Sequence, residues 1–298
     1  MQNEAKIIDG KELSHNLLEK LKVITELLKK NHSLYPKITT ILVGDNPASK
    51  LYVNNKIKTA HSIGIDAELT HMDSDIPTQE LEEKIDLLNA DRNANGILVQ
   101  LPLPKHIDQN LIMDKISPDK DVDGFHVHNV GMLNAWRKCL KPCTPQSILA
   151  ILHSVYGKDL TGKKAVVIGR SAIVGRPMAS MLIQEDCTVS VIHSKTIDPI
   201  PECNKADILI SAAGNPQMVK KNWVKNEACV IDVGITRKNG KLFGDVHFDE
   251  VKKIAKYITP VPGGVGPMTI AYLLKNTLEA CCNQNQLNFE TFYAKAKN

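Results

Sequence analysis

The sequence predicts an α/β protein made of two α/β domains in series, and three observations favour this fold class. Short apolar runs alternate with amphipathic stretches, which is typical of parallel sheets covered by helices. The alternation occurs twice, with a restart at "KPCTPQSILAILHSV". The length of 298 residues also fits two domains of roughly 150 residues each.

The first half is expected to form a β-α-β-α-β unit. Three segments have the aliphatic and β-branched composition of strands, and prolines close the last of them: residues 37–44, 65–72 and 96–104. Residues 78–90 are expected to be helical, because Leu81, Ile85 and Leu88 recur at three-to-four spacing.

A helix is expected between the first two strands, with Asn46 as its N-cap and Gly64 at its far end. On such a helix Ser49, Tyr52 and Lys56 fall within about 60° of one another. The helix follows the carboxyl end of a parallel strand, where ligands of open sheets bind. A lysine beside an apolar pocket can move protons, and a tyrosine ring can cover a planar ligand. The plainer alternative is a solvated lysine and a packed tyrosine.

The second half is expected to contain four further buried strands: residues 163–169, 187–193, 207–214 and 229–234. Residues 175–185 read as a helix between the first two of them. Thr144 is expected to cap an earlier helix, with Pro145 in its first turn. A last helix from about Met268 could pack against either domain.

"GRSAIVGRP" (169–177) follows a strand and precedes a helix, so its backbone N–H groups could bind a phosphate. It is not a full G-x-G-x-x-G, because Ser171 stands where a middle glycine would be. After the next strand come Ser194 and Lys195 in place of an acid, and Arg170 lies in the loop. These residues favour NADP over NAD. The alternative is a structural turn.

Two further loops have unusual compositions. Residues 119–131 place Asp119, Asp121 and Asp123 before a glycine, but no glutamate stands at position 12 of an EF-hand loop, and no metal site is predicted. His126 and His128 are expected to lie in an extended segment. Residues 259–269 hold three glycines and three prolines, so we expect no regular structure there but close backbone approach to a ligand. The alternative is a linker.

The composition argues against several classes of protein. The net charge of +4, without a Lys/Arg run, gives no reason to expect nucleic-acid binding, although it suits an anionic small molecule. No stretch approaches the roughly 20 apolar residues of a membrane span, and the first residues lack the apolar core of a signal peptide. Seven scattered cysteines without C-x-x-C predict reduced thiols in a cytoplasmic protein.

Taken together, these stretches resemble the bifunctional methylenetetrahydrofolate dehydrogenase/methenyltetrahydrofolate cyclohydrolase family. The resemblance runs almost end to end, through "LVGDNPASKLYVNNKIK", "GILVQLPLP", "PDKDVDGFH", "PCTP", "VVIGRSAIVGRPM", "HSKT", "VIDVGI", "GDV" and "ITPVPGGVGPMT". It implies oxidation of 5,10-methylenetetrahydrofolate by NADP+ to the methenyl compound, followed by hydrolysis to 10-formyltetrahydrofolate. Both steps would use one cleft between the two domains, the second of which would be a Rossmann-like dinucleotide-binding domain.

The resemblance also implies roles for individual residues. Lys56 matches the catalytic lysine, Tyr52 the stacking tyrosine, Gln100 the glutamine partner and Asp123 the pterin-binding aspartate. The remaining folate contacts would be Ser49, Leu101, Pro262, Gly263 and Gly264. The NADP contacts would be Gly169, Arg170, Ser171, Val174, Gly175, Ser194, Gly214 and Ile235.

The same resemblance implies a domain division and an assembly. Residues 1–143, completed by a C-terminal helix over 269–298, would form the folate-binding catalytic domain, and residues 144–268 the NADP-binding domain. A homodimer through the NADP-binding domain is expected, with a small-molecule folate substrate and no nucleic-acid or membrane partner.

Four other readings are less favoured. A short-chain dehydrogenase also uses Tyr-x-x-x-Lys with NADP, but there the tyrosine follows the nucleotide loop, whereas Tyr52 precedes Gly169. A shikimate-type dehydrogenase gives no reason for "PVPGGVGPMT". A non-catalytic nucleotide-binding module would not reduce NADP+ with a folate. A monofunctional family member is opposed by the presence of Lys56.

Overall fold

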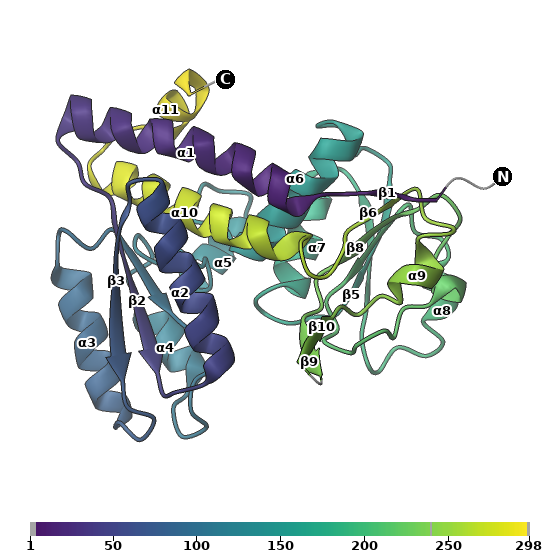
Figure 1. Ribbon diagram of the computed structural model, residues 1–298, viewed down its shortest axis with the longest axis horizontal. Helices are drawn as coiled ribbons and strands as arrows, with labels where there is room; N and C mark the ends of the chain where they lie inside the picture. Colours follow the sequence, from purple (N-terminus) through teal and green to yellow (C-terminus); the bar gives the residue numbers. More distant parts are fainter. Residues whose placement is uncertain (1–3, 239, 297–298) are drawn as a thin grey trace. The chain divides into compact units, whose positions relative to one another are not determined.

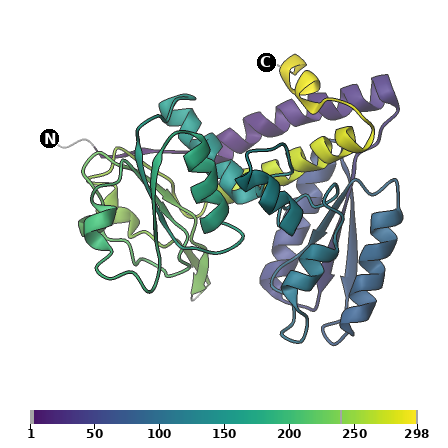
Figure 2. The same ribbon diagram turned by 180° about the vertical axis from the view of Figure 1, so that it is seen from behind.

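The computed structural model describes residues 4–238 and 240–296 and separates into two compact units (Figures 1 and 2). One unit, here the dinucleotide unit, contains the chain up to Ser14 and Thr144–Thr269. The other, here the lysine unit, contains His15–Cys143 and the chain from Ile270 onward. The chain passes from one unit to the other within α1 (Gly10–His32), at the start of α6 (Cys143–Tyr156) and within α10 (Val265–Gln284).

The lysine unit is built on a three-stranded parallel sheet. Its order is β3 (Asp66–Met72), β2 (Lys37–Val43) and β4 (Gly96–Val99), so that β2 is central. The three strands are those expected from the sequence. The last is shorter than the predicted 96–104, because the ladder stops before the prolines at 102 and 104.

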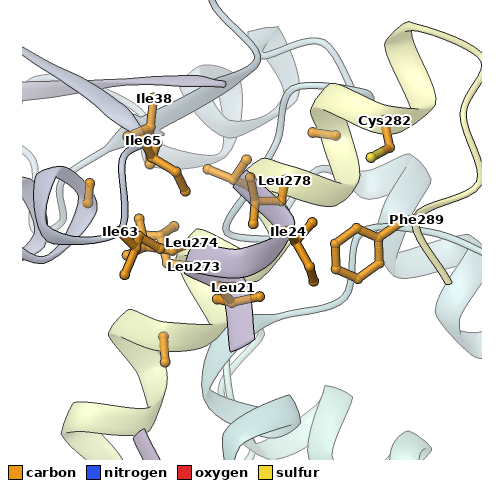
Figure 3. Close-up of a cluster of buried hydrophobic side chains, with 14 of the residues drawn as sticks. Leu21, Ile24, Ile38, Ile63, Ile65, Leu273, Leu274, Leu278, Cys282 and Phe289 are labelled. Atoms are coloured by element: carbon orange, nitrogen blue, oxygen red, sulfur yellow. The ribbon is translucent and has the colours of Figure 1, made fainter. Parts of the chain in front are cut away.

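Helices cover both faces of this sheet. On one face Ile41 and Val99 pack against α3 (Thr78–Ala90) and α4 (Gln109–Lys115). On the other face a larger cluster joins the sheet to α1, α2 (Pro47–Ser62), α10 and α11 (Phe289–Lys295) (Figure 3). Figure 3 shows side chains of α1 and α10 converging with Phe289. Burying one such aliphatic side chain contributes about 1.5–3 kcal/mol, so this cluster fixes α2 on the sheet.

The last long helix belongs largely to the lysine unit. It begins at Val265, earlier than the predicted start near residue 268 or 269, and Pro267 is tolerated because it lies in the first turn. The expectation that 259–269 has no regular structure was therefore wrong for its last five residues. Buried Asn276 then anchors this helix, since its Nδ2 donates to the carbonyls of Val122 and Lys141, at 2.8 Å each.

The dinucleotide unit is built on a six-stranded parallel sheet, which confirms the predicted fold class. Its order is β1 (Lys6–Ile7), β11 (Tyr257–Ile258), β8 (Cys229–Asp232), β7 (Ile208–Ser211), β5 (Lys164–Ile168) and β6 (Thr188–Ile192). After β6 the chain returns across β5 to form β7, so the topological switch lies between β5 and β7.

Two strands of this sheet, β1 and β11, were not predicted. They pair with each other in parallel, Lys6 opposite Tyr257 and Ile7 opposite Ile258. Residues 4–14 therefore lie in the dinucleotide unit, whereas the sequence analysis expected all of 1–143 in the other domain. A two-residue strand is too short to show a periodic pattern, which explains the difference.

Short elements complete the fold. In the dinucleotide unit α7 (Gly175–Gln184) packs on β5 and β6. The remaining elements of that unit are α8 (Ile200–Cys203), α9 (Phe248–Val251), a 3-10 turn (Lys221–Trp223) and an antiparallel pair, β9 (Thr236–Lys238) and β10 (Lys241–Phe243). No helix within the described residues is long and apolar enough to cross a membrane.

Several local predictions can be checked. Asn46 caps α2 as expected, its Oδ1 accepting from the N–H groups of Ala48 and Ser49. Gly64 has a φ of 79° at the far end of the same helix. Thr144 is not an N-cap, because α6 begins one residue earlier at Cys143. The extended segment expected around His128 is instead helix α5 (Val127–Asn134).

Candidate active site

Helix α2 presents the predicted lysine at the carboxyl end of β2. Ser49, Val53 and Ala60 are buried and form the inward face of the helix. Lys56 lies on the same face, three residues after Val53, and is half-buried. Tyr52 lies at the margin of this face, with 37% of its surface exposed. The helix therefore holds the amine at the rim of the core and leaves the tyrosine ring accessible.

Gln100 is the hydrogen-bond partner of Lys56. The Nζ of Lys56 donates to Oε1 of Gln100 at 2.9 Å. Gln100 follows the last residue of β4, and its own N–H donates to the Ile41 carbonyl at 2.9 Å. Its Nε2 donates to the Leu101 carbonyl at 2.7 Å, so only the amide oxygen is left to face the lysine. The two predicted residues, 44 positions apart in sequence, are thus joined by a side-chain hydrogen bond.

Asp123 is half-buried and close enough to Lys56 to interact with it electrostatically. Burial raises the pKa of its carboxyl to about 6, an effect that Lys56 opposes and the nearby Asp121 adds to. The Cys143 thiol is a hydrogen-bond partner of this carboxylate and also lies 3.2 Å from the Val122 carbonyl. Burial, followed by the charge of Asp123, raises the pKa of that thiol well above its usual range.

Asp121 organises the turn that carries Asp123. It is buried, its Oδ1 accepts from the Gly124 N–H at 3.0 Å, and its Oδ2 accepts from the His126 N–H at 2.8 Å. Oδ2 also accepts from Nδ2 of Asn129 at 2.9 Å. Burial raises the pKa of Asp121, and these hydrogen bonds oppose the shift. Asp121 thus has a local structural role, and it is not free to act as a metal ligand.

Lys120 fixes the other side of this turn. Its buried Nζ donates to the carbonyls of Leu88, Asn89 and Asp91, at 2.8, 2.9 and 2.6 Å. These carbonyls end helix α3, where a cation is favoured. Among the described residues, no group of three His, Cys, Asp or Glu side chains could hold a metal ion.

In the dinucleotide unit, the turn after β5 has room only for glycine. Gly169 has a φ of 120°, and a Cβ there would lie 2.4 Å from the Ala212 carbonyl oxygen. A Cβ at Gly175 would lie 2.1 Å from the Gly169 carbonyl oxygen. Such close backbone approach at the start of a helix is what a phosphate-binding turn requires. The structure therefore brings Gly169, Gly175 and the loop of Gly214 together at the switch point of the sheet.

Polar groups surround this turn. Ser171 Oγ accepts from the N–H groups of Val174 and Gly175, at 3.2 and 3.3 Å, where α7 begins. Arg170, Ser194 and Lys195 are exposed at the carboxyl ends of β5 and β6. A guanidinium, a hydroxyl and an ammonium suit a ribose 2′-phosphate, so the residues present fit NADP.

The other predicted residues of this unit lie at the ends of β8 and β11. Ile235 follows β8 and is 47% exposed. In the proline-glycine loop Gly263 has a φ of 106°, and a Cβ on Gly264 would lie 2.7 Å from the Pro260 carbonyl oxygen. This loop packs on the start of α1, where a Cβ at Gly10 would meet the Gly264 carbonyl oxygen at 1.8 Å.

The predicted residues therefore divide between the units. Ser49, Tyr52, Lys56, Gln100, Leu101 and Asp123 lie in the lysine unit. Pro262, Gly263, Gly264 and the predicted NADP contacts lie in the dinucleotide unit. Sequence reasoning missed the supporting residues Lys120, Asp121 and Cys143. No pattern in the sequence separates Asp121 from Asp123, because Asp121 is bound by backbone N–H groups and by Asn129, which the fold brings close.

Comparison with known proteins identifies the family. A family model described as the tetrahydrofolate dehydrogenase/cyclohydrolase catalytic domain matches residues 8–123, and one for the NAD(P)-binding domain of the same family matches residues 142–285. The bifunctional protein FolD of Wolbachia sp. subsp. Drosophila simulans is 50% identical over 288 residues, covering 96% of this chain and 98% of its own.

Solved structures agree. The bifunctional enzyme FolD of Campylobacter jejuni is 47% identical, with a TM-score of 0.91 over 94% of this chain and 99% of its own. The methylenetetrahydrofolate dehydrogenase-cyclohydrolase of Trypanosoma brucei, solved in complex with NADP cofactor and inhibitor, is 38% identical with a TM-score of 0.91, over 95% and 99%. Both halves of the sequence match one family, and this decides against the short-chain and shikimate-type alternatives. The chain belongs to the tetrahydrofolate dehydrogenase/cyclohydrolase family.

Proposed function

We propose that Lys56, held by Gln100, is the proton carrier of a bifunctional enzyme. The enzyme oxidises 5,10-methylenetetrahydrofolate with NADP+ and hydrolyses the methenyl product to 10-formyltetrahydrofolate. The observation that carries the assignment of roles is the 2.9 Å hydrogen bond from Lys56 Nζ to Gln100 Oε1. It places an amine and an uncharged amide at the end of a parallel sheet, where ligands of such sheets bind.

The oxidation step needs little acid–base chemistry. When bound, NADP+ accepts a hydride from the carbon that bridges the two folate nitrogens. The product is a cation whose charge is shared by those nitrogens, so the protein need not remove a proton. Its main contribution is orientation, which is worth about 7–11 kcal/mol at best in model reactions.

The hydrolysis step does need a proton carrier. Water adds to the methenyl cation, and the tetrahedral adduct must lose a proton and break one C–N bond. Lys56 takes this role, because its amine can accept a proton from the attacking water and return it to the leaving nitrogen. Gln100 orients the amine, and an amide does not favour the ammonium form as a carboxylate would. Positioned acid–base groups of this kind contribute about 10²–10⁴-fold.

Asp123 and Tyr52 serve folate binding. A carboxylate can accept two N–H bonds from the amide-like edge of a pterin, and hydrogen bonds to a charged acceptor are strong. Tyr52 is accessible enough to stack on the pterin ring. We assign Ser49, Leu101 and the Pro262–Gly264 loop to the same ligand.

NADP+ binding is assigned to the residues around the β5 turn. The N–H groups after Gly169 face the pyrophosphate, while Arg170 and Ser194 read the 2′-phosphate. Val174, Gly175, Gly214 and Ile235 supply backbone and apolar contacts. With this division the lysine unit binds folate and the dinucleotide unit binds NADP+, apart from the proline-glycine loop.

A homodimer in the cytoplasm is the assembly and location we propose. Strand β6 is at the edge of the six-stranded sheet, with Val191 39% exposed on it and Ile183 of α7 49% exposed. An apolar edge strand supports pairing with a second copy. All seven cysteines lie in the described part of the chain as free thiols, which supports a reducing compartment.

Replacing Lys56 by Met tests the proton-carrier role. We expect cyclohydrolase activity to fall at least about 10³-fold, while NADP+ reduction with methylenetetrahydrofolate remains measurable. Lys58→Met is the matched control, since that lysine is exposed on the same helix. Equal loss of both activities in a folded Lys56→Met protein would remove Lys56 from this role.

A further inference from the structure

Two buried aspartates that the proposed chemistry does not use lie at the carboxyl edge of the six-stranded sheet. Asp232 is the last residue of β8 and is 4% exposed. Asp245 follows β10 and is 0% exposed. Buried carboxylates are rare unless they are paired with a cation or serve a function. None of the ion pairs found among the described residues includes either one.

Asp245 holds the loop that follows β7. Its Oδ2 accepts from the Ser211 hydroxyl at 3.1 Å and from the N–H groups of Ala213 and Gly214, at 2.7 and 3.1 Å. Between these donors lies Ala212, whose carbonyl oxygen is the atom pressed against Gly169. Oδ2 of Asp245 therefore fixes the position of residues 211–214, against which the phosphate-binding turn at Gly169 packs.

Asp232 holds the loop that follows β8 and also holds Asp245. Its Oδ1 accepts from the N–H groups of Gly234 and Asp245, at 3.0 and 2.9 Å. Its Oδ2 accepts from the Val246 N–H at 2.9 Å. The two aspartates thus form a chain of hydrogen bonds, here called the aspartate relay. In it Asp232 holds the backbone of Asp245 in place, and Asp245 holds the loop of Gly214 in place.

Two glycines leave space for this relay. A Cβ at Gly234 would lie 2.2 Å from Oδ1 of Asp245, and a Cβ at Gly244 would lie 1.9 Å from Oδ2 of Asp232. Each carboxylate therefore contacts the backbone of a glycine, and any larger residue at that position would overlap the carboxylate. Such tight packing allows only one arrangement of the two loops.

One oxygen of this pair of aspartates stands apart from the other three. Oδ1 of Asp245 is buried and finds no hydrogen-bond partner within the described part of the chain. Burial raises the pKa of Asp232 to about 7, and the charge of Asp245 adds to the shift. A buried oxygen without a partner is uncommon in native proteins, and such groups are often found at functional sites.

The strand order suggests what the two loops face. If the 2′-phosphate lies beside Ser194 after β6 and the pyrophosphate lies on the β5 turn, the cofactor runs from β6 across β5. Its nicotinamide half then lies over the ends of β7 and β8. These are the loops that Asp245 and Asp232 hold.

We propose that Asp245 is a positioning residue for the nicotinamide half of NADP+, acting through the N–H groups of Ala213 and Gly214, with Asp232 as its support. The proposal rests on the proposed function, because it presumes that NADP+ binds at this edge. It does not require either aspartate to touch the substrate.

The test exploits the two activities of the protein. Hydrolysis of supplied methenyltetrahydrofolate needs no NADP+, so it reports on the integrity of the fold and of the lysine site. For Asp245→Ala we expect the Kd of NADP+, measured by calorimetry, to rise about tenfold, with a similar loss of dehydrogenase kcat/KM. Cyclohydrolase activity is expected to stay within about twofold of the wild-type value, because that reaction does not use the nicotinamide.

Asp245→Asn keeps an oxygen acceptor and is expected to be intermediate, with a rise in Kd of about threefold. It carries the test if the alanine variant does not fold. Asp249→Ala is the control, since Asp249 is exposed four residues further on.

An unchanged Kd in folded Asp245→Asn, or a fall of both activities in parallel, overturns the positioning role. A wild-type protein that binds NADP+ but does not reduce it with a folate would instead refute the proposed function, and the calorimetric comparison would still stand.

Discussion

The two sheet ends of this protein offer different kinds of groups to the ligands that we propose for them. At the lysine unit the working groups are side chains: an amine, an amide and a carboxylate reach out from α2, from the end of β4 and from a tight turn. At the dinucleotide unit the groups that we propose for binding are mainly backbone N–H groups and the space left by glycines, with the side chains of Arg170 and Ser194 added for the 2′-phosphate. Proton chemistry needs ionisable side chains, whereas a phosphorylated dinucleotide needs donors and close approach.

This difference predicts how each region responds to substitution. In the lysine unit a side chain can be removed with little disturbance of the backbone. We therefore expect such a substitution to lower the catalytic rate or the folate affinity and to leave the fold intact. In the dinucleotide unit an added methyl group must move the backbone. We therefore expect such a substitution to weaken NADP+ binding by displacing the backbone N–H groups. Four experiments test this contrast between the two units.

Asp123→Ala should have the largest effect. It removes an acceptor of two charge-assisted hydrogen bonds, so we expect the Kd of a folate analogue to rise about 100-fold. Both activities should fall, while NADP+ affinity stays near the wild-type value. Asp119→Ala, exposed four residues earlier, should change neither. A folate affinity equal to that of the wild type would refute the assignment of Asp123.

Gly169→Ala should impair NADP+ binding by about 30-fold, because the new Cβ meets the Ala212 carbonyl and the backbone φ is 120°. Gly157→Ala is a close control, since Gly157 also has a positive φ of 78° but nothing lies within 4 Å of the new Cβ. If both variants bind NADP+ equally well, the close approach at Gly169 has no role in the cofactor site. Cyclohydrolase activity should survive in both.

Arg170→Ala should raise the Michaelis constant for NADP+ about tenfold, through the loss of one guanidinium–phosphate interaction. The constant for NAD+, which lacks the 2′-phosphate, should change much less. Arg176→Ala, exposed on α7, provides the comparison. A parallel rise for both cofactors would mean that Arg170 does not distinguish them.

The smallest effect concerns pH. The pKa of Asp123 is raised to about 6, with Lys56, Asp121 and Cys143 as its charged and polar neighbours. Its carboxylate is the form that accepts pterin N–H bonds, so folate kcat/KM should fall as the pH drops through 6. Between pH 7.5 and 5.5 we expect a loss of about fourfold. Asp123→Asn should lack this step, and an identical profile in that variant would assign the ionisation elsewhere.

The contrast also explains what the sequence could and could not predict. The N-cap Asn46, the helix face of Lys56 and the seven predicted strands follow from local pattern or from residue type, and the structure contains them. Gln100 was predicted through the family resemblance alone, and the structure joins it to Lys56 by a hydrogen bond. Asp232 and Asp245 do not, because their partners are backbone N–H groups brought close by the fold. Every residue except proline has a backbone N–H group, so the amino-acid sequence does not show which of these groups an aspartate binds.

Some predicted boundaries of helices and strands were wrong for similar reasons. Strand β1 depends on pairing with β11, some 250 residues further on, which no local window can reveal. Helix α6 begins at Cys143, two residues before the start that follows from Thr144 as N-cap. A threonine before a proline suits the first turn as well as the cap.

The pairing of β1 with β11 has a consequence for synthesis on the ribosome. Residues Lys6 and Ile7 are synthesised about 250 residues before their partners Tyr257 and Ile258. The sheet edge formed by β11 can be covered only once these partners are present, and the core around α1 likewise waits for α10. Each unit can therefore complete its core only after β11 and α10 have been synthesised, so β1 and α1 wait for partners that lie far along the chain.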